Sequence, residues 1–389
     1  MSIKICGIGV VSSLGMGCDR NLQSLVNERC GIDRITQIDT SVDVPVGEVK
    51  KSNDELKEIL GLSNRITVSR TALIGALAAK EAVEKARIPL NKRIGLVSST
   101  TVGGMGLSEE FYKDFQLNPK QGRLRNIAGH DCATSTEFIA DCCGINGFRT
   151  TISTACSSAA NAVIMGAEML DCNMLDYVVV GGVDALCRFT LNGFNSLMIL
   201  DKGLCRPFDR DRNGLNLGEG AGYLVMTKDE MCTDSYCFLK GYANANDAFH
   251  QTASSDSGEG AYLAMSEAMV MSGFKPEDID YINLHGTGTG NNDLSELAAL
   301  KRLFGEEIPA CSSTKSFTGH TLAAAGGIEA VYSVMSIVNG VRYANLRFGN
   351  QIEGGVTPVT NTETDVEVRN VLSNSFGFGG NCSALIFSK

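Results

Sequence analysis

Short β-branched strands alternate with long helices along the 389-residue chain, and this alternation most restricts its fold. The expected strands are rich in Val, Ile and Thr, and they span residues 3–11, 94–99, 150–154, 177–182, 222–226, 238–243, 281–284 and 371–375. The expected helices repeat apolar residues at every third or fourth position, and they span residues 71–86, 157–170, 260–271, 295–303 and 323–338. This order predicts an α/β fold.

The order of these elements also indicates an internal duplication. In the first half, a strand is followed by the strand–Cys–helix segment ISTACSSAANAV and then by a pair of strands. The second half repeats this order with STKSFTGHTLAAAGG and a final pair that ends in NCSALIFSK. We therefore expect two similar halves, residues 1–232 and 233–389, whose loops meet at one cleft.

Composition and charge narrow the class of protein. Hydrophobic residues make up 43% and charged residues 20%, as in ordinary globular proteins. The formal charge of −10 disfavours nonspecific binding to nucleic acid or to an anionic membrane. Because the sequence has neither a run of 18 apolar residues nor a signal-cleavage pattern, we expect a cytoplasmic protein that does not span a membrane. The 14 cysteines follow no regular spacing, which favours reduced thiols.

Cys156 lies where a strand is expected to end and a helix to begin. At such a turn the sulfur would be near free helix N–H groups and the positive end of the helix dipole, and both favour the thiolate. This position suits a nucleophile. Taken alone, however, a cysteine here is slightly more often a small buried core residue.

Two of the four histidines follow expected strands in the second half. His285 opens the loop HGTGTGNND, and His320 lies in TKSFTGHTLAAAGG. One such histidine is more often a hydrogen-bonded core residue, but two of them, with a cysteine at the same kind of turn, favour a catalytic site. His130 and His250 lie in polar, loop-like sequence and carry no such signal.

Lys315 and Glu296 are close in sequence to the two histidines. Lys315 precedes His320 by five positions, and Glu296 follows His285 by eleven. Such a pair could hold a water chain and set the imidazole tautomers. Surface charges are the alternative, and for Glu296 taken alone they are favoured.

Motifs for nucleotide and metal binding fail when they are checked against the sequence. GIGVVS has a serine in place of the third glycine of a dinucleotide fingerprint, and no GxxxxGK[ST] occurs. DRDRNG begins like a calcium loop, but Gly220 stands where the bidentate acid belongs. Neither a pair of CxxC motifs nor HExxH is present. We therefore expect no metal.

Five segments together resemble the β-ketoacyl-acyl-carrier-protein synthases, condensing enzymes with a thiolase-like fold. The segments are ISTACSSAANAV, PFDRDRNGLNLGEGAGYLV, HGTGTGNNDLSE, STKSFTGHTLAAAGG and NSFGFGGNCSALIF, in the order of the family. The resemblance covers essentially the whole chain and implies two similar halves in a layered αβαβα architecture. Two positions depart from the pattern: Gly290 stands where Pro is frequent, and Asn381 stands where many members have Thr followed by Asn.

The resemblance implies that an acyl group on a cysteine condenses with a malonyl-acyl carrier protein as carbon dioxide is lost. The nucleophile, the two histidines, the lysine and the acid of the family fall on Cys156, His285, His320, Lys315 and Glu296. The backbone N–H groups of Cys156 and Phe378 would form an oxyanion hole. Phe378 would also gate access to Cys156, and no cofactor would be needed.

The resemblance also implies two partners. An acidic acyl carrier protein would dock on a basic patch, for which Arg65, Arg70, Lys202 and Arg206 are candidates. A homodimer would form along the TTISTAC strand, which would otherwise be an exposed sheet edge.

Alternatives to this reading remain open. The second histidine and the GHTLAAAGG segment argue against a thiolase-type condensing enzyme. A noncatalytic partner subunit of a heterodimer usually lacks the nucleophile, and Cys156 argues against it. Fatty acid, polyketide and aryl-polyene pathways all remain open, because no motif sets the acyl length.

Overall fold

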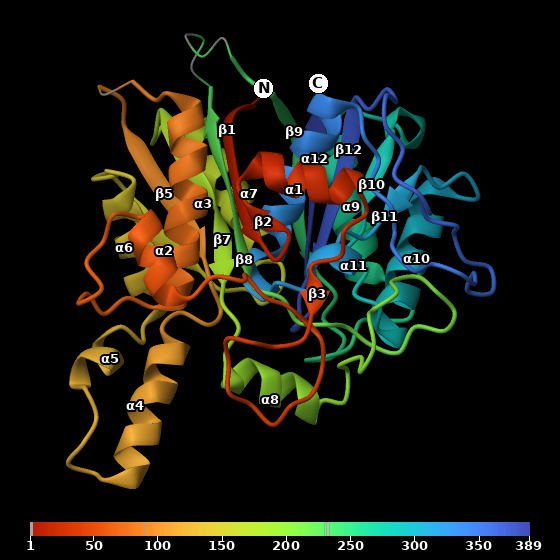
Figure 1. Ribbon diagram of the computed structural model, residues 1–389. Coiled ribbons are helices and arrows are strands. Elements are labelled where there is room, and N and C mark those ends of the chain that lie inside the picture. The colour runs from red at the N-terminus through yellow and green to blue at the C-terminus, as the bar shows by residue number, and fades with distance from the viewer. Residues whose placement is uncertain (1–2, 90, 229, 231, 233) are drawn as a thin grey trace.

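A computed structural model describes residues 3–89, 91–228, 230, 232 and 234–389 (Figure 1). Its strands are β1 (Ile3–Ser12), β2 (Gly15–Met16), β3 (Ile32–Asp33), β4 (Val46–Gly47), β5 (Ile94–Ser99), β6 (Arg149–Ile152), β7 (Tyr177–Asp184), β8 (Gly220–Thr227), β9 (Cys237–Asn246), β10 (Tyr281–Asn283), β11 (Cys311–Ser312), β12 (Asn370–Phe376) and β13 (Asn381–Ser388).

The helices in the described part of the chain are α1 (Cys18–Val26), α2 (Asn53–Ile59), α3 (Arg70–Ala86), α4 (Met105–Leu117), α5 (Leu124–Ala128), α6 (Cys132–Cys142), α7 (Ser158–Asp171), α8 (Arg188–Ser196), α9 (Glu259–Ser272), α10 (Gly290–Phe304), α11 (Lys315–Thr318) and α12 (Ala325–Asn339). Two short 3₁₀ turns, η1 (Pro276–Asp278) and η2 (Leu322–Ala324), precede β10 and α12.

A long mixed sheet forms the frame of the molecule. Its strand order over the described residues is β11-β10-β12-β13-β9-β1-β8-β7-β5-β6, and β2 pairs with β1. The antiparallel pairing of β1 with β9 joins the part of the sheet built from the first half of the chain to the part built from the second. The predicted α/β class is therefore confirmed.

Helices pack on both faces of this sheet, and two of them lie between its two parts (Figure 1). Helix α3 packs on β1, β8 and β7, with α6 beside it, while α9 packs on β9 and β13, with α10 beside it. Between these outer layers lie α7 and α12, which contact each other and strands of both parts of the sheet. The loops at the starts of these two central helices carry Cys156 and His320.

Close approach of backbones explains two of the strand glycines. A Cβ on Gly9 would lie 2.0 Å from the main-chain oxygen of Ala78 in α3. A Cβ on Gly222 would lie 2.3 Å from the main-chain nitrogen of Ile328 in α12. Both contacts are far shorter than van der Waals distance, so β1 and β8 can lie against their helices only where a side chain is missing.

The segment between β5 and β6 was not predicted to contain helices. It forms α4, α5 and α6, and α4 and α5 project away from the body of the molecule (Figure 1). Several large apolar side chains on this projection are exposed: Tyr112, Phe115, Leu117, Leu124 and Ile127. Short helices with an incomplete apolar face give weak periodicity, which is why the sequence did not predict them.

Two features bear on the compartment and membrane expectations. Twelve of the 14 cysteines are free, in agreement with the expected reduced thiols. The exception is a disulfide between Cys6 and Cys232, which the pairing of β1 with β9 brings together from distant parts of the chain. The stretch Leu322–Asn339 is long and apolar enough to cross a membrane. Most of it is buried inside the fold, as in the core helix of a globular protein.

Candidate active site

Cys156 lies on a tight connection between β6 and α7. Ala155, directly before it, has a φ of 52°, in the left-handed region that L-residues rarely adopt. The turn is closed by a hydrogen bond from the Thr154 N–H to Ser158 Oγ (2.8 Å) and by one from Ser158 Oγ to the Ala155 carbonyl (2.5 Å). The strained turn presents the Cys156 side chain, which is 6% exposed, to the centre of the molecule.

Burial raises the pKa of the Cys156 thiol to about 11. The positive charge of Lys315 and the hydrogen bond from the Phe378 N–H act in the opposite direction and lower this pKa. Burial of the anion thus opposes the thiolate that the helix terminus is expected to favour.

His285 follows β10 and is held by a buried carboxylate. Glu296, on α10, accepts hydrogen bonds from the backbone N–H of His285 (2.9 Å) and of Gly286 (2.8 Å). It also accepts one from Asn374 Nδ2 (3.1 Å) on the neighbouring strand β12. Burial raises the pKa of Glu296 to about 7. The predicted acid thus fixes the backbone of the His285 loop and does not face the cavity.

Lys315 is 2% exposed, and its three ammonium hydrogens have three acceptors. Its Nζ donates to the His285 carbonyl (2.6 Å), lies 3.3 Å from His285 Nδ1, and forms an ion pair with Glu329. The sequence had suggested Glu296 as the acid that accompanies this lysine. In the structure the partner is Glu329, on α12, because the central helix passes directly beside α11.

The hydrogen bonds define the tautomers of both histidines. An ammonium group only donates, so His285 Nδ1 accepts from Lys315 and its Nε2 carries the hydrogen. His320 Nδ1 accepts from the backbone N–H of Leu322 (3.1 Å), so its Nε2 also carries a hydrogen. Burial and the nearby Lys315 charge lower the pKa of both rings well below 6.5. Both histidines are therefore neutral donors at pH 7.

One cavity of about 170 Å³ brings the predicted residues together. Its lining includes Cys156, His285, His320 and Phe378, with the glycines around Phe378 and the loop after His285. The two imidazole rings lie 5.4 Å apart, nearly perpendicular to each other. Residues from the first half and the second half of the chain thus meet at one site.

A second cavity, of about 210 Å³, lies on the other side of an aromatic pair. It is mostly apolar, and Val102, Met105 and Leu322 contribute to its lining. Cys156, Phe194 and Phe378 line both cavities, and the two phenylalanine rings are stacked with centroids 6.0 Å apart. The pair therefore separates the catalytic cavity from an apolar chamber that also reaches Cys156.

Sequence reasoning missed Glu329 and Phe194. Glu329 is the single acidic residue in the apolar helix segment GGIEAVYSVM, and an acid there must be paired when the helix is buried. This lone acid in an apolar segment could therefore have predicted a buried ion pair at Glu329. Phe194 lies on α8, a short helix with no clear periodicity, and nothing in the local sequence separates it from an ordinary apolar residue.

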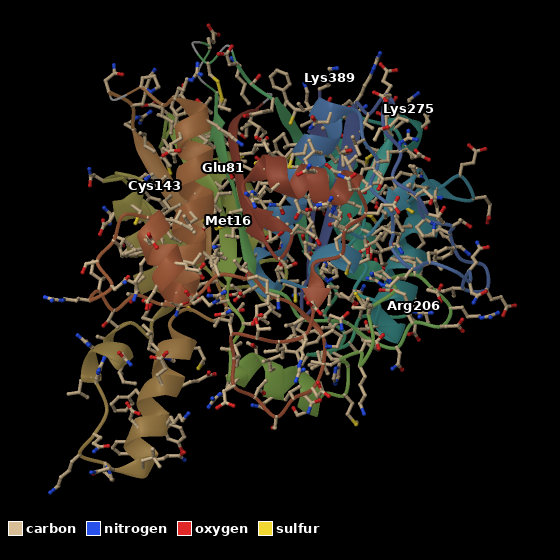
Figure 2. All side chains as sticks on the ribbon, in the orientation of Figure 1. Met16, Glu81, Cys143, Arg206, Lys275 and Lys389 are labelled. Carbon is tan, nitrogen blue, oxygen red and sulfur yellow. A yellow bond between two sulfur atoms is a disulfide. The ribbon has the colours of Figure 1, made fainter. Side chains whose placement is uncertain are left out.

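The four proposed docking residues do not form one patch. Arg70 is partly buried, and its guanidinium forms an ion pair with Glu219 inside the fold, which leaves little of it for a partner protein. Arg65 is exposed and lies in a groove of about 560 Å³ with Arg123 and Arg125. Figure 2 shows Arg206 on the opposite side of the molecule from α4 and α5.

No group of three or more His, Cys, Asp or Glu side chains among the described residues is arranged to hold a metal ion. The chemistry available at the site is that of a buried thiol and neutral hydrogen-bond donors.

Two protein-family models match most of the chain. The model of the β-ketoacyl synthase N-terminal domain matches residues 1–231, and that of the C-terminal domain matches residues 236–348. The chain belongs to the β-ketoacyl synthase family. It is a condensing enzyme of the acyltransferase class, which confirms the family and the reaction class predicted from the sequence.

Relatives with curated names support this assignment. A 3-oxoacyl-[acyl-carrier-protein] synthase 2 of Staphylococcus aureus (strain COL) is 32% identical over 419 residues, covering 100% of this chain and 98% of the relative. The protein of the same name from Rhizobium meliloti (strain 1021) is 29% identical over 422 residues, with 100% and 98% covered.

Solved structures agree on the fold. The ishigamide ketosynthase/chain length factor matches with a TM-score of 0.93 and 27% identity, covering 100% of this chain and 99% of the other. The ketosynthase ApeO in complex with its chain length factor ApeC, from Xenorhabdus doucetiae, matches with a TM-score of 0.83 and 30% identity, covering 100% and 98%. The synthase therefore has the predicted thiolase-like fold.

Proposed function

We propose that this synthase condenses an acyl group carried on Cys156 with a malonyl thioester of an acyl carrier protein, using His285, His320, Lys315 and Glu296. The observation that carries this proposal is the shared cavity, in which a buried thiol faces two neutral histidines. The names of the curated relatives, which specify acyl-carrier-protein synthases, support the choice of carrier.

In the first step, Cys156 takes the acyl group from its carrier. The sulfur forms a bond to the thioester carbonyl, the carbon–sulfur bond to the carrier breaks, and the thiol proton leaves with the carrier thiol. The backbone N–H groups of Cys156 and Phe378 stabilise the oxyanion of the tetrahedral intermediate. Phe378 and Cys156 line the same cavity, and the Phe378 N–H lowers the pKa of the Cys156 thiol, which supports this role.

In the second step, the malonyl thioester loses carbon dioxide. The bond between the carboxylate carbon and the α-carbon breaks, and its electron pair forms an enolate whose oxygen accepts hydrogen bonds from the Nε2–H groups of His285 and His320. Neutral donors suit this step because they stabilise the developing charge without giving up a proton. Lys315 keeps the His285 ring in the required tautomer, and Glu296 holds its backbone.

In the third step, the enolate carbon attacks the acyl group on Cys156. The new carbon–carbon bond forms as the carbon–sulfur bond to Cys156 breaks, and the cysteine sulfur takes a proton from solvent. The products are a 3-oxoacyl carrier protein, carbon dioxide and the free enzyme. These steps need no metal or organic cofactor.

The apolar cavity behind Phe378 is the proposed acyl chamber. Its largely apolar lining suits a hydrocarbon chain, and it adjoins Cys156 directly. Phe378, stacked on Phe194, would act as the gate between this chamber and the catalytic cavity.

The carrier protein is proposed to dock beside the groove that contains Arg65. Arg123 and Arg125 line the same groove and extend the basic patch beyond the residue predicted from the sequence. Lys202 is exposed, and the backbone of Arg206 lies near Gly288, next to the loop that lines the catalytic cavity. These two residues are proposed to contact the part of the carrier that enters the site.

We also propose that the protein is a dimer. Strand β6 ends the sheet order in the described residues, as expected for the TTISTAC strand, and its residues are partly exposed. The exposed apolar side chains of α4 and α5 provide further surface for a partner. Relatives whose structures contain a chain length factor make a heterodimer the alternative to a homodimer. Light scattering at micromolar concentration is expected to give twice the chain mass, and a monomer contradicts the proposal.

Two further sequence predictions remain proposals: the division into halves 1–232 and 233–389, and a cytoplasmic location. The role of a noncatalytic partner subunit stays the second candidate, and the presence of Cys156 with both histidines disfavours it.

The Cys156→Ala variant tests the function. It is expected to lose elongation completely while it still releases carbon dioxide from malonyl-acyl carrier protein, because decarboxylation needs mainly the histidine donors. Intact-mass analysis of the wild-type protein, incubated with a panel of acyl-carrier-protein thioesters, is expected to show the acyl group on Cys156 and its length. Elongation by Cys156→Ala would refute the nucleophile, and absence of any acyl-enzyme in the wild type would favour the noncatalytic candidate.

A further inference from the structure

The loop that connects β12 to β13 carries Phe378 and is closed by its own backbone. The Gly377 N–H donates to the Asn381 carbonyl (2.8 Å), and the Gly380 N–H donates to the Gly377 carbonyl (3.1 Å). Gly379 and Gly380 have φ values of 84° and 81°, which only glycine adopts without strain. The loop is therefore a compact turn whose position depends on what holds its ends.

The start of this loop touches the nucleophile turn. A Cβ on Gly377 would lie 3.2 Å from the Cys156 nitrogen and 3.2 Å from Ser157 Oγ. Close contact alone does not determine which way the Phe378 N–H points. A directional connection between the loop and the nucleophile turn is needed for that.

Asn381, at the end of the loop, supplies this connection. Its Oδ1 lies 2.6 Å from Ser157 Oγ, 2.7 Å from Asn161 Nδ2 and 2.8 Å from Asn244 Nδ2, and each of these groups can donate to it. Ser157 is the residue after Cys156, and Asn161 lies one turn further along α7. A single side-chain oxygen thus joins the loop to the first turn of the nucleophile helix.

The surrounding amides keep the Asn381 side chain in one orientation. Asn381 Nδ2 donates to Asn244 Oδ1 (3.3 Å), which would be lost if the amide were flipped. Asn161 Oδ1 accepts in turn from Asn244 Nδ2 (2.9 Å) and from Ser383 Oγ (2.8 Å). Asn161 Nδ2 also reaches Thr154 Oγ1 (2.8 Å), on the other side of the nucleophile turn. Three asparagines from α7, β9 and β13 therefore form one network.

We propose that Asn381 is a positioning residue that holds the Phe378 N–H against the Cys156 sulfur and so prepares the oxyanion site for acyl transfer. This inference rests on the proposed function, because it assigns the residue to the acyl-transfer step. It is specific to this chain, since Asn381 stands where the sequence pattern of the family often has threonine. Threonine has a shorter side chain with a single hydroxyl, which cannot replace both the carbonyl oxygen and the NH₂ group of the Asn381 amide.

The inference predicts different effects on the two half-reactions. Asn381→Ala loosens the loop, so the Phe378 N–H bonds the Cys156 sulfur less well, and acylation of Cys156 is expected to slow about three- to tenfold. Decarboxylation depends on His285 and His320, which the network does not touch. In a Cys156→Ala background, carbon dioxide release is expected to stay within about twofold of its value with Asn381 intact.

A second readout needs neither carrier nor substrate. Alkylation of Cys156 by iodoacetamide is followed against pH, with each cysteine resolved by peptide mass spectrometry. Because the Phe378 N–H stabilises the thiolate, Asn381→Ala is expected to shift the alkylation profile upward by about 0.5 to 1 pH unit, which is measured below the midpoint as an alkylation rate about three- to tenfold lower at each pH. The charged groups that act on Cys156 are Lys315, Asp184 and Glu329, and the variant alters none of them.

Ser383→Ala is the matched control. Ser383 lies on β13 two residues beyond Asn381, is fully buried, and bonds Asn161 and Asn244 without contacting Asn381 or Ser157. Removing its hydroxyl perturbs the same network but is expected to leave the alkylation profile and the acylation rate unchanged. If Asn381→Ala fails to fold, Asn244→Ala removes one of the three donors, and it is expected to shift the profile in the same direction by a smaller amount.

The outcomes separate the inference from the proposed function. An upward shift in Asn381→Ala, with the control unchanged, supports positioning even if the condensation assignment is wrong. An unchanged alkylation profile overturns the inference, even if condensation proceeds as proposed. Equal losses in Asn381→Ala and Ser383→Ala also overturn it, because they indicate a general structural role.

Discussion

His320 allows the sharpest test of the proposed enolate site. The imidazole is 2% exposed and neutral, its Nδ1 is occupied by the Leu322 N–H, and its Nε2–H is left for the substrate. Replacing it by alanine removes one of the two buried donors of the site. Loss of one preorganised donor of this kind costs about 10²–10³ in rate, or about 2.7–4 kcal/mol of transition-state stabilisation.

The assay isolates the step by using the Cys156→Ala background, in which condensation cannot follow. Carbon dioxide release from malonyl-acyl carrier protein is expected to fall about 10²- to 10³-fold in the double variant with His320→Ala. His320→Gln, whose amide N–H reaches about as far as Nε2, is expected to recover part of the rate. His130→Ala changes an exposed histidine whose ring bonds Ser108, away from the catalytic cavity, and serves as the control.

Cys156 acylation by an acyl thioester gives the complementary measurement. The charge that lowers the Cys156 pKa comes from Lys315, so His320→Ala in the presence of the native cysteine is expected to retain acylation to within about tenfold. Carbon dioxide release within threefold of the parent would refute the donor role. Complete loss of acylation would instead show that His320 acts as the base for Cys156.

The pH dependence of the same step tests the protonation state. Burial and Lys315 lower the pKa of His285 and His320 well below 6.5, so both rings stay neutral as the pH falls from about 8 to about 6. Decarboxylation by Cys156→Ala is therefore expected to stay flat over this range. A loss with a midpoint near 6.5 would mean that the rings are accessible to water and titrate normally.

Three further changes probe the frame of the site. Burial raises the pKa of Glu296 above that of the unfolded chain, so the contribution of this carboxyl to the free energy of unfolding, measured by urea, is expected to decline as the pH rises from about 5 to about 8, and Glu296→Gln is expected to lack this decline; an equal decline in both proteins would contradict the burial of this carboxylate. Gly222→Ala places a Cβ 2.3 Å from the backbone of α12 and is expected to lower the melting temperature by several degrees, whereas an unchanged melting temperature would contradict the close packing. Phe194→Ala leaves Phe378 in place and is expected to shift the acyl groups trapped on the nucleophile toward longer chains; an unchanged distribution would place the acyl chamber elsewhere.

Much of the fold could be read from local patterns. The strand expected at residues 177–182 is β7, and the helix expected at 157–170 is α7, displaced by one residue. Buried strands of this kind carry runs of Val and Ile, and buried helices carry Ala and Leu at helical spacing, so the signal lies within a few neighbouring residues. The helices α4 and α5 were missed because their apolar residues face outward and do not follow a core stripe.

Ion pairs between residues that are distant in the sequence could not be predicted from such local patterns. In the sequence Arg70 has no feature that separates it from other charged residues. In the structure it forms an ion pair with Glu219, which is 149 positions away in the chain. Lys315 was paired with the wrong acid, because the choice between Glu296 and Glu329 depends on which helix passes beside α11. Sequence separation carries no information about such a choice.

The sequence by itself determined the family of this protein and its class of reaction. Five segments in the order of the family resemble the β-ketoacyl-acyl-carrier-protein synthases, and such a resemblance is carried by local sequence alone. Only the tertiary structure decided the protonation states, since burial of Cys156 raises its pKa to about 11 and burial of the histidines keeps them neutral. The physical reason is that the free energy of a charge depends on every group and every water molecule within several ångströms, and chain folding alone determines which groups those are.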